Sequence, residues 1–328
     1  MTAAEILAAF PQKSALVVGD ICLDRWCTYD PALSEPSRET GIPRIGVVSV
    51  EVTPGAGGTV ANNLAALGVG RVAVLGVVGD DGSCYELARE LARRSIFVDL
   101  CLRCPELPTF TYSKLINKDT GQEDQPRVDF IYAQPASAEM ERELIARLHA
   151  ASEAFDVILV SDQTEIRNGG IVTAGMRQAL AEMAQANPEK VIWVDSRVHA
   201  GLFRGVIVKP NAQEAEAASQ ELFGCIDYQR LRRHLESKLL FVTQGPEGVL
   251  VCSEHGETRV PTRPVAQPVD ICGAGDSFSA GASVALAITG SAVDAARFGN
   301  LVASVTIMKK GTGTATPAEI LEAASRPS

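Results

Sequence analysis

The chain has 328 residues, of which 46% are hydrophobic and 21% are charged, and its formal net charge is −10. This composition supplies enough apolar residues for a large core and excludes an intrinsically disordered chain. The acidic balance, without any run of lysine and arginine, argues against a nucleic-acid partner, because phosphate backbones are bound by basic patches.

The N-terminal stretch "MTAAEILAAF" lacks the basic start of a secretory leader, and no apolar run approaches the roughly 20 residues of a membrane span. The eight cysteines are scattered, without the dense spacing of a disulfide framework. Cys101 and Cys104 form a lone CxxC pair, for which chance spacing is favoured over a zinc or redox site. We therefore expect a reduced, soluble, cytoplasmic protein without a membrane partner.

Short β-branched runs alternate with Ala-, Leu- and Glu-rich stretches along most of the chain. This alternation predicts an α/β fold with three layers, in which helices cover both faces of a mostly parallel central sheet. The expected strands cover residues 15–20, 71–79, 155–162, 190–196, 205–211 and 239–245, and the expected helices cover 60–68, 85–95, 138–151 and 174–185. Ligands of such sheets bind at the carboxyl ends of the strands, where the polar residues are Asp20, Asp24, Asp80, Asp81, Asp162, Asp195, Asn211 and Thr243.

Two segments, about 25–53 and 108–133, show alternating patterns without a helix. In the second, residues 109–116 and 127–132 flank a polar stretch rich in turn formers, which predicts a hairpin. We interpret both segments as a small antiparallel β lid inserted into one domain of residues 1–328. The lid is expected to have an exposed strand edge and an apolar face. We therefore expect the protein to form a homodimer whose interface is the lid.

The stretch "DICGAGDSFSAG", residues 270–281, places two glycines and two acids before a run with helical spacing. Unpaired N–H groups and the helix dipole at such a helix start favour a bound anion. Asp276 in the first turn would lie beside that anion, as a base for a group that attacks a phosphate. The alternative is an ordinary first-turn acid after a tight turn.

Asn211 and Glu214 follow an expected strand three residues apart, a spacing that places both on one side of a helix start. They could hold a hydrated Mg²⁺, or they could form an ordinary proline-led helix start. Residues 243–250, "TQGPEGVL" with Thr243, Gly245 and Gly248, predict a strand, a glycine turn and a strand. This pattern is typical either of a turn whose backbone approaches a bound nucleotide or of an ordinary hairpin.

Together and in this order, these segments resemble the PfkB, or ribokinase-like, family of carbohydrate kinases, and the resemblance covers nearly the whole chain. The resemblance implies ATP and Mg²⁺ as cofactors. It implies that Gly273, Ala274 and Gly275 form an anion hole for the transferred γ-phosphoryl group and that Asp276 is the catalytic base. It also implies that Asp270 anchors this loop, beside a monovalent cation such as K⁺ in some members.

Within the family, "VVGDICLDRW", "SRETGIPRIGVVSVE", "PGAGGTVANNLAALG" and "RVDF" resemble kinases that phosphorylate D-glycero-D-manno-heptose 7-phosphate. By this resemblance Asp24 binds sugar hydroxyls, while Lys114 and Arg127 approach the phosphate of the substrate. An alternative for Arg127 is a solvated pair with Asp129 on the same strand face.

Some positions depart from the family pattern. At the position of the family's sugar-binding asparagine, this chain has Thr59. Asn62 and Asn63, one helical turn further along, could take over that contact, or the alignment with the family could be shifted in register. Cys272 stands where threonine is usual, either as a small-residue replacement or as a redox-sensitive thiol beside the anion hole. The catalytic positions are intact, so a sugar or sugar-phosphate kinase is the main hypothesis. The alternatives are a nucleoside kinase or other sugar kinase of this fold, or a non-catalytic binding protein.

Overall fold

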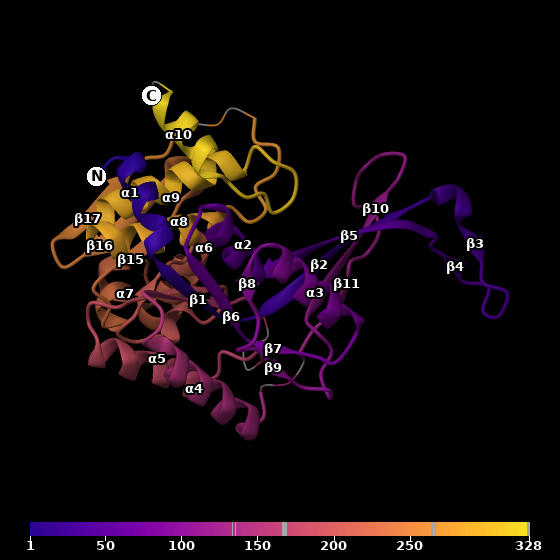
Figure 1. Cartoon of the computed structure of the whole chain (residues 1–328), viewed down its shortest axis with the longest axis horizontal. Helices are drawn as coiled ribbons and strands as arrows, with labels where there is room; N and C mark the ends of the chain where they lie inside the picture. Colours follow the sequence, from indigo (N-terminus) through magenta and orange to yellow (C-terminus); the bar gives the residue numbers. More distant parts are fainter. Residues whose placement is uncertain (133, 135, 166–168, 264, 266, 327–328) are drawn as a thin grey trace.

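The computed structural model describes residues 1–132, 134, 136–165, 169–263, 265 and 267–326, which form a layered body and a projecting arm (Figure 1). Within these residues the central sheet has nine strands: β17 (Gly256–Val260), β16 (Val249–Ser253), β15 (Leu240–Thr243), β14 (Ile207–Val208), β13 (Val191–Ser196), β12 (Val157–Asp162), β1 (Ser14–Gly19), β6 (Arg71–Leu75) and β8 (Ile96–Phe97). The strands from β15 to β8 are parallel, and only β16 and β17 at one edge are antiparallel. The predicted mostly parallel sheet is confirmed.

Helices cover both faces of this sheet because successive strand residues point to opposite sides. In β1, Ala15 and Val17 pack in one core cluster, and Leu16 and Val18 pack in the other. The first face carries α1 (Ala3–Ala9), α2 (Gly57–Ala66), α3 (Gly82–Arg93), α8 (Ala274–Thr289), α9 (Ala292–Thr306) and α10 (Pro317–Ser325). The second carries α4 (Ala138–Ser152), α5 (Ala174–Ala186), α6 (Ala212–Phe223) and α7 (Tyr228–His234).

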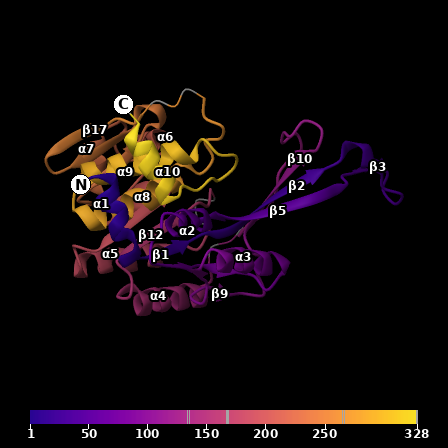
Figure 2. The same cartoon turned by 45° about the horizontal axis from the view of Figure 1, so that its top comes forward.

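The projecting arm is the predicted lid, and Figures 1 and 2 show β2 and β5 running out of the body to one side. Its sheet has the order β11-β10-β2-β5, with bounds Val128–Phe130, Thr111–Asn117, Ile21–Tyr29 and Val47–Ala56. The β10–β11 hairpin forms as predicted and β2 pairs antiparallel with β5, but β10 pairs parallel with β2. The lid sheet is therefore mixed at its centre. Residue 133, the predicted end of the lid, lies outside the described residues.

Two small ribbons complete the strands: β3 (Glu35–Pro36) with β4 (Pro43–Arg44) near the tip of the arm, and β7 (Val77–Val78) with β9 (Leu102–Arg103) below it (Figure 1). Short 3₁₀ turns are η1 (Phe10–Gln12), η2 (Pro31–Leu33), η3 (Ala200–Leu202) and η4 (Gly245–Glu247). Among the described helices, none combines the length and the apolar character needed to cross a bilayer.

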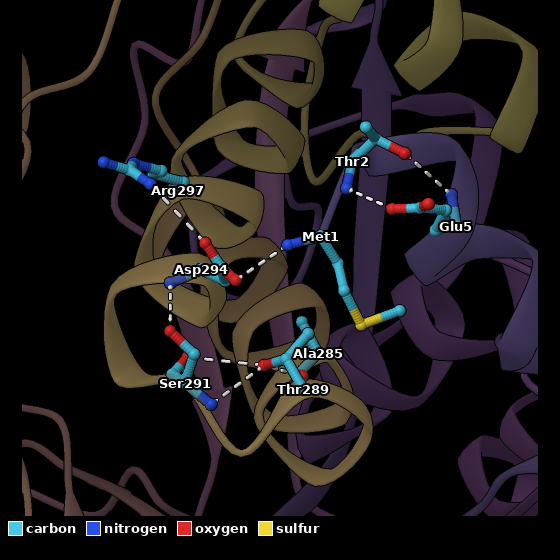
Figure 3. A network of polar contacts seen from close by, with 8 residues as sticks. All are labelled: Met1, Thr2, Glu5, Ala285, Thr289, Ser291, Asp294 and Arg297. Carbon is cyan, nitrogen blue, oxygen red and sulfur yellow. Dashed lines mark hydrogen bonds and ion pairs between the residues drawn. The ribbon is translucent and has the colours of Figure 1, made fainter.

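The N-terminus is tied to α9, on the helical face that also carries α8 (Figure 3). The Met1 ammonium group donates to Asp294 at 2.9 Å, and Asp294 also accepts from Arg297. Thr2 and Glu5 form a reciprocal capping box that begins α1. These bonds fix the first helix beside α9 at the edge of the same layer.

Candidate active site

The glycine turn of residues 270–281 begins the buried helix α8, as its sequence predicted. Gly273 has a left-handed backbone with φ of 76°, and no side chain caps the helix start. The hydrogen bonds of the described residues leave the N–H groups of Gly273, Gly275 and Asp276 unpaired, whereas Ala274 donates to the Ile271 carbonyl at 3.2 Å. Unpaired donors at the positive end of a helix attract an anion.

This helix start opens into a cavity of about 950 Å³, called here the main cavity. Nine predicted site residues line it: Asn211, Glu214, Thr243, Gly245, Gly248, Gly273, Ala274, Gly275 and Asp276. Its apolar lining comes from other segments and includes Val265, Pro268, Phe278, Ala303 and Ile307. A concave site with an apolar part and converging polar groups is typical of small-molecule binding.

The Asp276 carboxyl has a strongly shifted acidity. Burial raises the pKa of Asp276 from 3.8 to about 7, and the neighbouring Asp195 carboxylate adds to this effect. The positive charges of Lys209 and Arg197 act in the opposite direction and lower this pKa. The charge of Asp24 on the lid raises it further. A carboxyl group with a pKa near neutrality can take up a proton at the pH of the cell, as a general base must.

Sequence reasoning missed the ion pair beneath Asp276. Lys209 Nζ lies 2.7 Å from Asp195 Oδ2, and both side chains are almost completely buried. Burial alone would lower the pKa of Lys209, but Asp195 more than offsets it, so this pKa is raised and the ammonium stays charged. A Cβ on Gly275 would lie 3.1 Å from Lys209 Nζ, so glycine keeps the turn open toward that charge. The available signal was a lysine directly before Pro210 and Asn211 at a strand end.

Arg197 is a second cation that the sequence did not single out. It follows β13, lines the main cavity, and donates to Gln163 at 2.9 Å and to Glu165 at 2.6 Å. These two bonds hold the guanidinium beside the cavity, where its charge lowers the pKa of Asp276. Lys209 and Arg197 are therefore two cations beside the main cavity, each paired with a carboxylate, and both charges lower the pKa of Asp276.

Asn211 and Glu214 form the start of α6. The Asn211 side chain accepts from the Glu214 N–H at 2.9 Å, and the Glu214 carboxylate accepts from the Asn211 N–H at 2.8 Å. This capping box matches the ordinary helix-start alternative, yet both residues also line the main cavity. Only one carboxylate oxygen of Glu214 is used in the box, so the other fits a water-mediated Mg²⁺ contact. Burial raises the pKa of Glu214.

Thr243, Gly245 and Gly248 lie where β15 turns through η4 into antiparallel β16, so the strand–turn–strand prediction is confirmed. Gly248 has φ of 90°, and a Cβ there would lie 2.3 Å from the Val260 carbonyl oxygen. Only glycine fits that approach. The turn therefore presents backbone rather than side chains to the cavity.

Asp270 lies outside the lining of the main cavity and ties two loops together. Its carboxylate accepts from the Cys272 N–H at 2.9 Å and from the Gly311 N–H at 3.0 Å. Cys272 is exposed as a residue, but partial burial of its thiol group raises the thiol pKa, against the charge of Lys114 and together with the nearby carboxylates. Cys101 and Cys104 are also unpaired thiols, and burial raises the pKa of both. A raised pKa disfavours the reactive thiolate.

The predicted substrate residues of the lid lie around Asp24. Burial raises the pKa of Asp24 to about 6, while the charges of Lys114 and Arg127 lower it. Lys114 Nζ lies 4.3 Å from the centre of the Trp26 ring. Arg127 forms an ion pair with Asp129 at 2.7 Å, as the alternative interpretation of this residue predicted. Its guanidinium also stacks on the Tyr112 ring, 4.5 Å from the ring centre.

The three predicted residues of α2 are engaged within the protein and do not line the main cavity. Thr59 donates to the Pro54 carbonyl at 3.2 Å, and Asn63 donates to the Thr59 carbonyl at 3.0 Å. Asn62 accepts from Arg94 at 2.9 Å. Both Thr59 and Asn63 are fully buried, and Asn63 Oδ1 has no hydrogen-bond partner among the described residues.

Comparison with known proteins agrees with this geometry. The model of the pfkB family carbohydrate kinases matches residues 13–319. The bifunctional protein HldE of Rhodopseudomonas palustris strain BisA53 is 30% identical over 323 residues, and the match covers 96% of this chain and 64% of that protein. The chain thus spans under two thirds of the curated relatives that it matches.

Solved structures show the same fold. The ribokinase of Thermotoga maritima aligns with a TM-score of 0.72 at 21% identity, over 96% of this chain and all of that one. An Arabidopsis thaliana ribokinase aligns with a TM-score of 0.69 at 19% identity, over 96% and 99%. The family match extends over nearly the whole chain and includes every segment of the main cavity. The chain therefore belongs to the pfkB family of carbohydrate kinases, phosphotransferases that act on an alcohol group.

Proposed function

We propose that the protein transfers the γ-phosphoryl group of ATP to a hydroxyl group of a sugar or sugar phosphate. The observation that carries this proposal is the place of Asp276, in the first turn of α8, between unpaired backbone N–H groups and the buried Lys209–Asp195 pair. Asp276 accepts the proton of the acceptor hydroxyl. The oxygen then bonds to the γ phosphorus while the bond to the β–γ bridging oxygen breaks, and ADP leaves with that electron pair.

The other residues of the main cavity have supporting roles in this proposal. In the turn of Gly273, Ala274 and Gly275, the unpaired N–H groups of Gly273 and Gly275 donate to the transferred phosphoryl group, where negative charge is spread over its oxygens. The Ala274 N–H holds the turn through the Ile271 carbonyl. The apolar lining accommodates the adenine ring, beside the backbone turn at Gly245 and Gly248. Asn211 and Glu214 would hold hydrated Mg²⁺, which neutralises charge on the phosphate oxygens when bound.

The acceptor that the sequence motifs favour is D-glycero-D-manno-heptose 7-phosphate or a related sugar phosphate. Asp24 would accept hydrogen bonds from its hydroxyls, and Lys114 and Arg127 would approach its phosphate. A substrate contact through the Asn62 oxygen would compete with Arg94, which donates to that oxygen. K⁺ near Asp270 and a homodimer through the lid stay predictions.

The test is ADP release from ATP and Mg²⁺ by the purified protein with a panel of acceptors. The panel contains free hexoses, hexose phosphates, the heptose 7-phosphate and nucleosides, and mass spectrometry identifies the phosphorylated product. Turnover of one sugar or sugar phosphate is the expected result. Turnover of nucleosides alone would replace the proposed acceptor class. ATP binding without turnover of any acceptor would favour the non-catalytic alternative.

A further inference from the structure

Three cationic side chains belong to the described lining of the main cavity: Arg197, Lys209 and Arg263. The Lys209 side chain is 4% exposed and paired with Asp195, so its ammonium is almost inaccessible beneath the glycine turn. Arg263 donates to the Ala323 carbonyl at 2.6 Å, which holds its guanidinium toward α10. The Arg197 side chain is 45% exposed. Among these three, Arg197 is therefore the cation that a molecule in the cavity can reach most directly.

A neutral partner fixes the orientation of the Arg197 guanidinium. Its Nε donates to Gln163 Oε1 at 2.9 Å, and the Gln163 N–H donates to Asp20 Oδ2 at 2.8 Å. Asp20 is almost completely buried, so Gln163 is tied to the interior of the body. The Arg197 N–H also donates to the Asp162 carbonyl at 3.1 Å. Backbone and side chain are thus both held at the end of β13, which preorganises the guanidinium for a ligand.

The Arg197 guanidinium keeps donors that the described residues do not use. Its Nε donates to Gln163 and its Nη1 donates to Glu165, whereas Nη2 donates to none of the residues that the structure describes. A guanidinium is a planar fork, and its parallel N–H groups can donate to two oxygens of one phosphate. The side chain can therefore bind a phosphoryl group while Gln163 still holds it.

The carboxylate of Glu165 is a partner that a phosphate can replace. It accepts from Arg197 at 2.6 Å, but the Glu165 side chain is 72% exposed. Ion pairs between exposed side chains contribute little to stability, because water solvates each charge well. A terminal phosphate carries more negative charge than one carboxylate and offers three acceptor oxygens. We therefore expect a γ-phosphoryl group in the cavity to displace Glu165 from Nη1.

The charge of Arg197 acts on groups at both ends of the proposed reaction. Burial raises the pKa of Asp276, the proposed base, and of Glu214, the proposed Mg²⁺ contact, and the charge of Arg197 lowers the pKa of both. Burial also raises the pKa of Tyr112 on the lid strand β10, and the same guanidinium lowers it. Arg197 is therefore within electrostatic reach of the base, the metal contact and the lid, and the γ-phosphoryl group has to pass between them.

We propose that Arg197 binds the γ-phosphoryl group of the donor nucleotide and stays bound to it during transfer. When the nucleotide binds, the guanidinium exchanges Glu165 for oxygens of the γ-phosphoryl group, and Gln163 keeps its plane fixed. Arg197 neutralises charge on these oxygens and moves no proton. The inference rests on the proposed function, because it adds a contact to the group that this function transfers. The alternative is that Arg197 only ties Glu165 to Gln163.

The test compares ADP with AMP-PNP, a non-hydrolysable analogue that adds the terminal phosphoryl group. Isothermal titration calorimetry with Mg²⁺ measures both affinities, and ADP release from ATP with the best acceptor measures kcat. Arg197→Met removes the cation, and Glu165→Gln removes the competing carboxylate. Arg326→Met is the matched control, because Arg326 forms an ion pair of the same 2.6 Å length with Glu322 and does not line the main cavity.

The two cavity variants are expected to act in opposite directions. Arg197→Met should weaken AMP-PNP binding at least about tenfold and change ADP binding by less than about twofold, since only AMP-PNP has the contacted group. It should also lower kcat at least about 100-fold, as loss of an arginine on the transferred group does. Glu165→Gln should bind AMP-PNP about threefold more tightly, because an exposed competitor is removed. Arg326→Met should match the wild type in every measurement.

Equal weakening of ADP and AMP-PNP in Arg197→Met, or no weakening of either, would overturn the contact. Unchanged or weaker AMP-PNP binding in Glu165→Gln would overturn the exchange, because Glu165 would then not compete with the nucleotide. If the AMP-PNP effects appear but no acceptor is turned over, the proposed function fails and the contact stands. Turnover of an acceptor with unchanged AMP-PNP binding in Arg197→Met leaves the function and removes the contact.

Discussion

The ammonium group of Lys209 lies 2.7 Å from the carboxylate of Asp195, and this buried pair is packed beneath the first turn of α8. Neither charge can leave the other without remaining in a poorly solvated place. The pair also acts on Asp276, whose pKa is raised by Asp195 and lowered by Lys209. The ion pair therefore connects the stability of the fold to the acidity of the proposed base.

Replacing Lys209 with methionine is expected to lower the free energy of unfolding by about 3–5 kcal/mol, because Asp195 stays buried without a partner. Urea unfolding measures this loss. The double variant Lys209→Met with Asp195→Asn removes both charges and is expected to recover most of it. A single variant as stable as the wild type, or a double variant no better than the single one, would contradict this account of the pair.

Glu214→Gln is expected to raise the Mg²⁺ concentration for half-maximal turnover about tenfold, as loss of an outer-shell ligand does. Glutamine also completes a capping box, so α6 should begin normally. The measurement is a Mg²⁺ titration of ADP release with saturating ATP. Glu5→Gln, in the capping box of α1, is the matched control and should leave the titration unchanged. An identical titration for Glu214→Gln would remove this residue from the metal site.

Ala56→Gly is expected to stabilise the protein by about 1 kcal/mol, because Ala56 has a backbone that favours glycine. Its φ is 49° and its ψ is −122°, directly before α2. Thermal and urea unfolding measure the change. The opposite effect, a loss of about 1 kcal/mol, is expected for Ala88→Gly inside α3, where glycine only adds freedom to the unfolded chain. A loss at both positions would show that Ala56 is not strained.

The acidity of Asp20 predicts a pH-dependent difference in stability. Burial, and then the charge of Asp162, raise the pKa of Asp20 from 3.8 to about 7. Between these values the folded protein binds a proton that the unfolded chain has released, so the free energy of unfolding falls as the pH rises. Asp20→Asn removes this contribution, and its stability relative to the wild type should increase from pH 4 to pH 8. A difference independent of pH would contradict the raised pKa.

The sequence predicted the layers, the parallel sheet and the glycine turn because these features have local periodicity or composition. The parallel pairing of β10 with β2 was not predictable, since it joins segments about 80 residues apart that have no common pattern. The Lys209–Asp195 pair depends on the adjacency of β13 and β14, which individual strand patterns do not give. The sequence does not show that Asn62 is engaged, because its partner, Arg94, lies 32 residues further along the chain, directly after α3.

The most direct test of the proposed mechanism is the kinetic effect of Asp276→Asn. Asparagine keeps the shape of the side chain and removes its ability to accept a proton. The matched control is Asp294→Asn, which changes a first-turn aspartate of α9 that does not line the main cavity. We predict that kcat for the best acceptor falls at least about 100-fold in Asp276→Asn, as expected for loss of a general base, with ATP affinity retained and the control unaffected. Turnover close to that of the wild type in Asp276→Asn would contradict the assignment of Asp276 as the base.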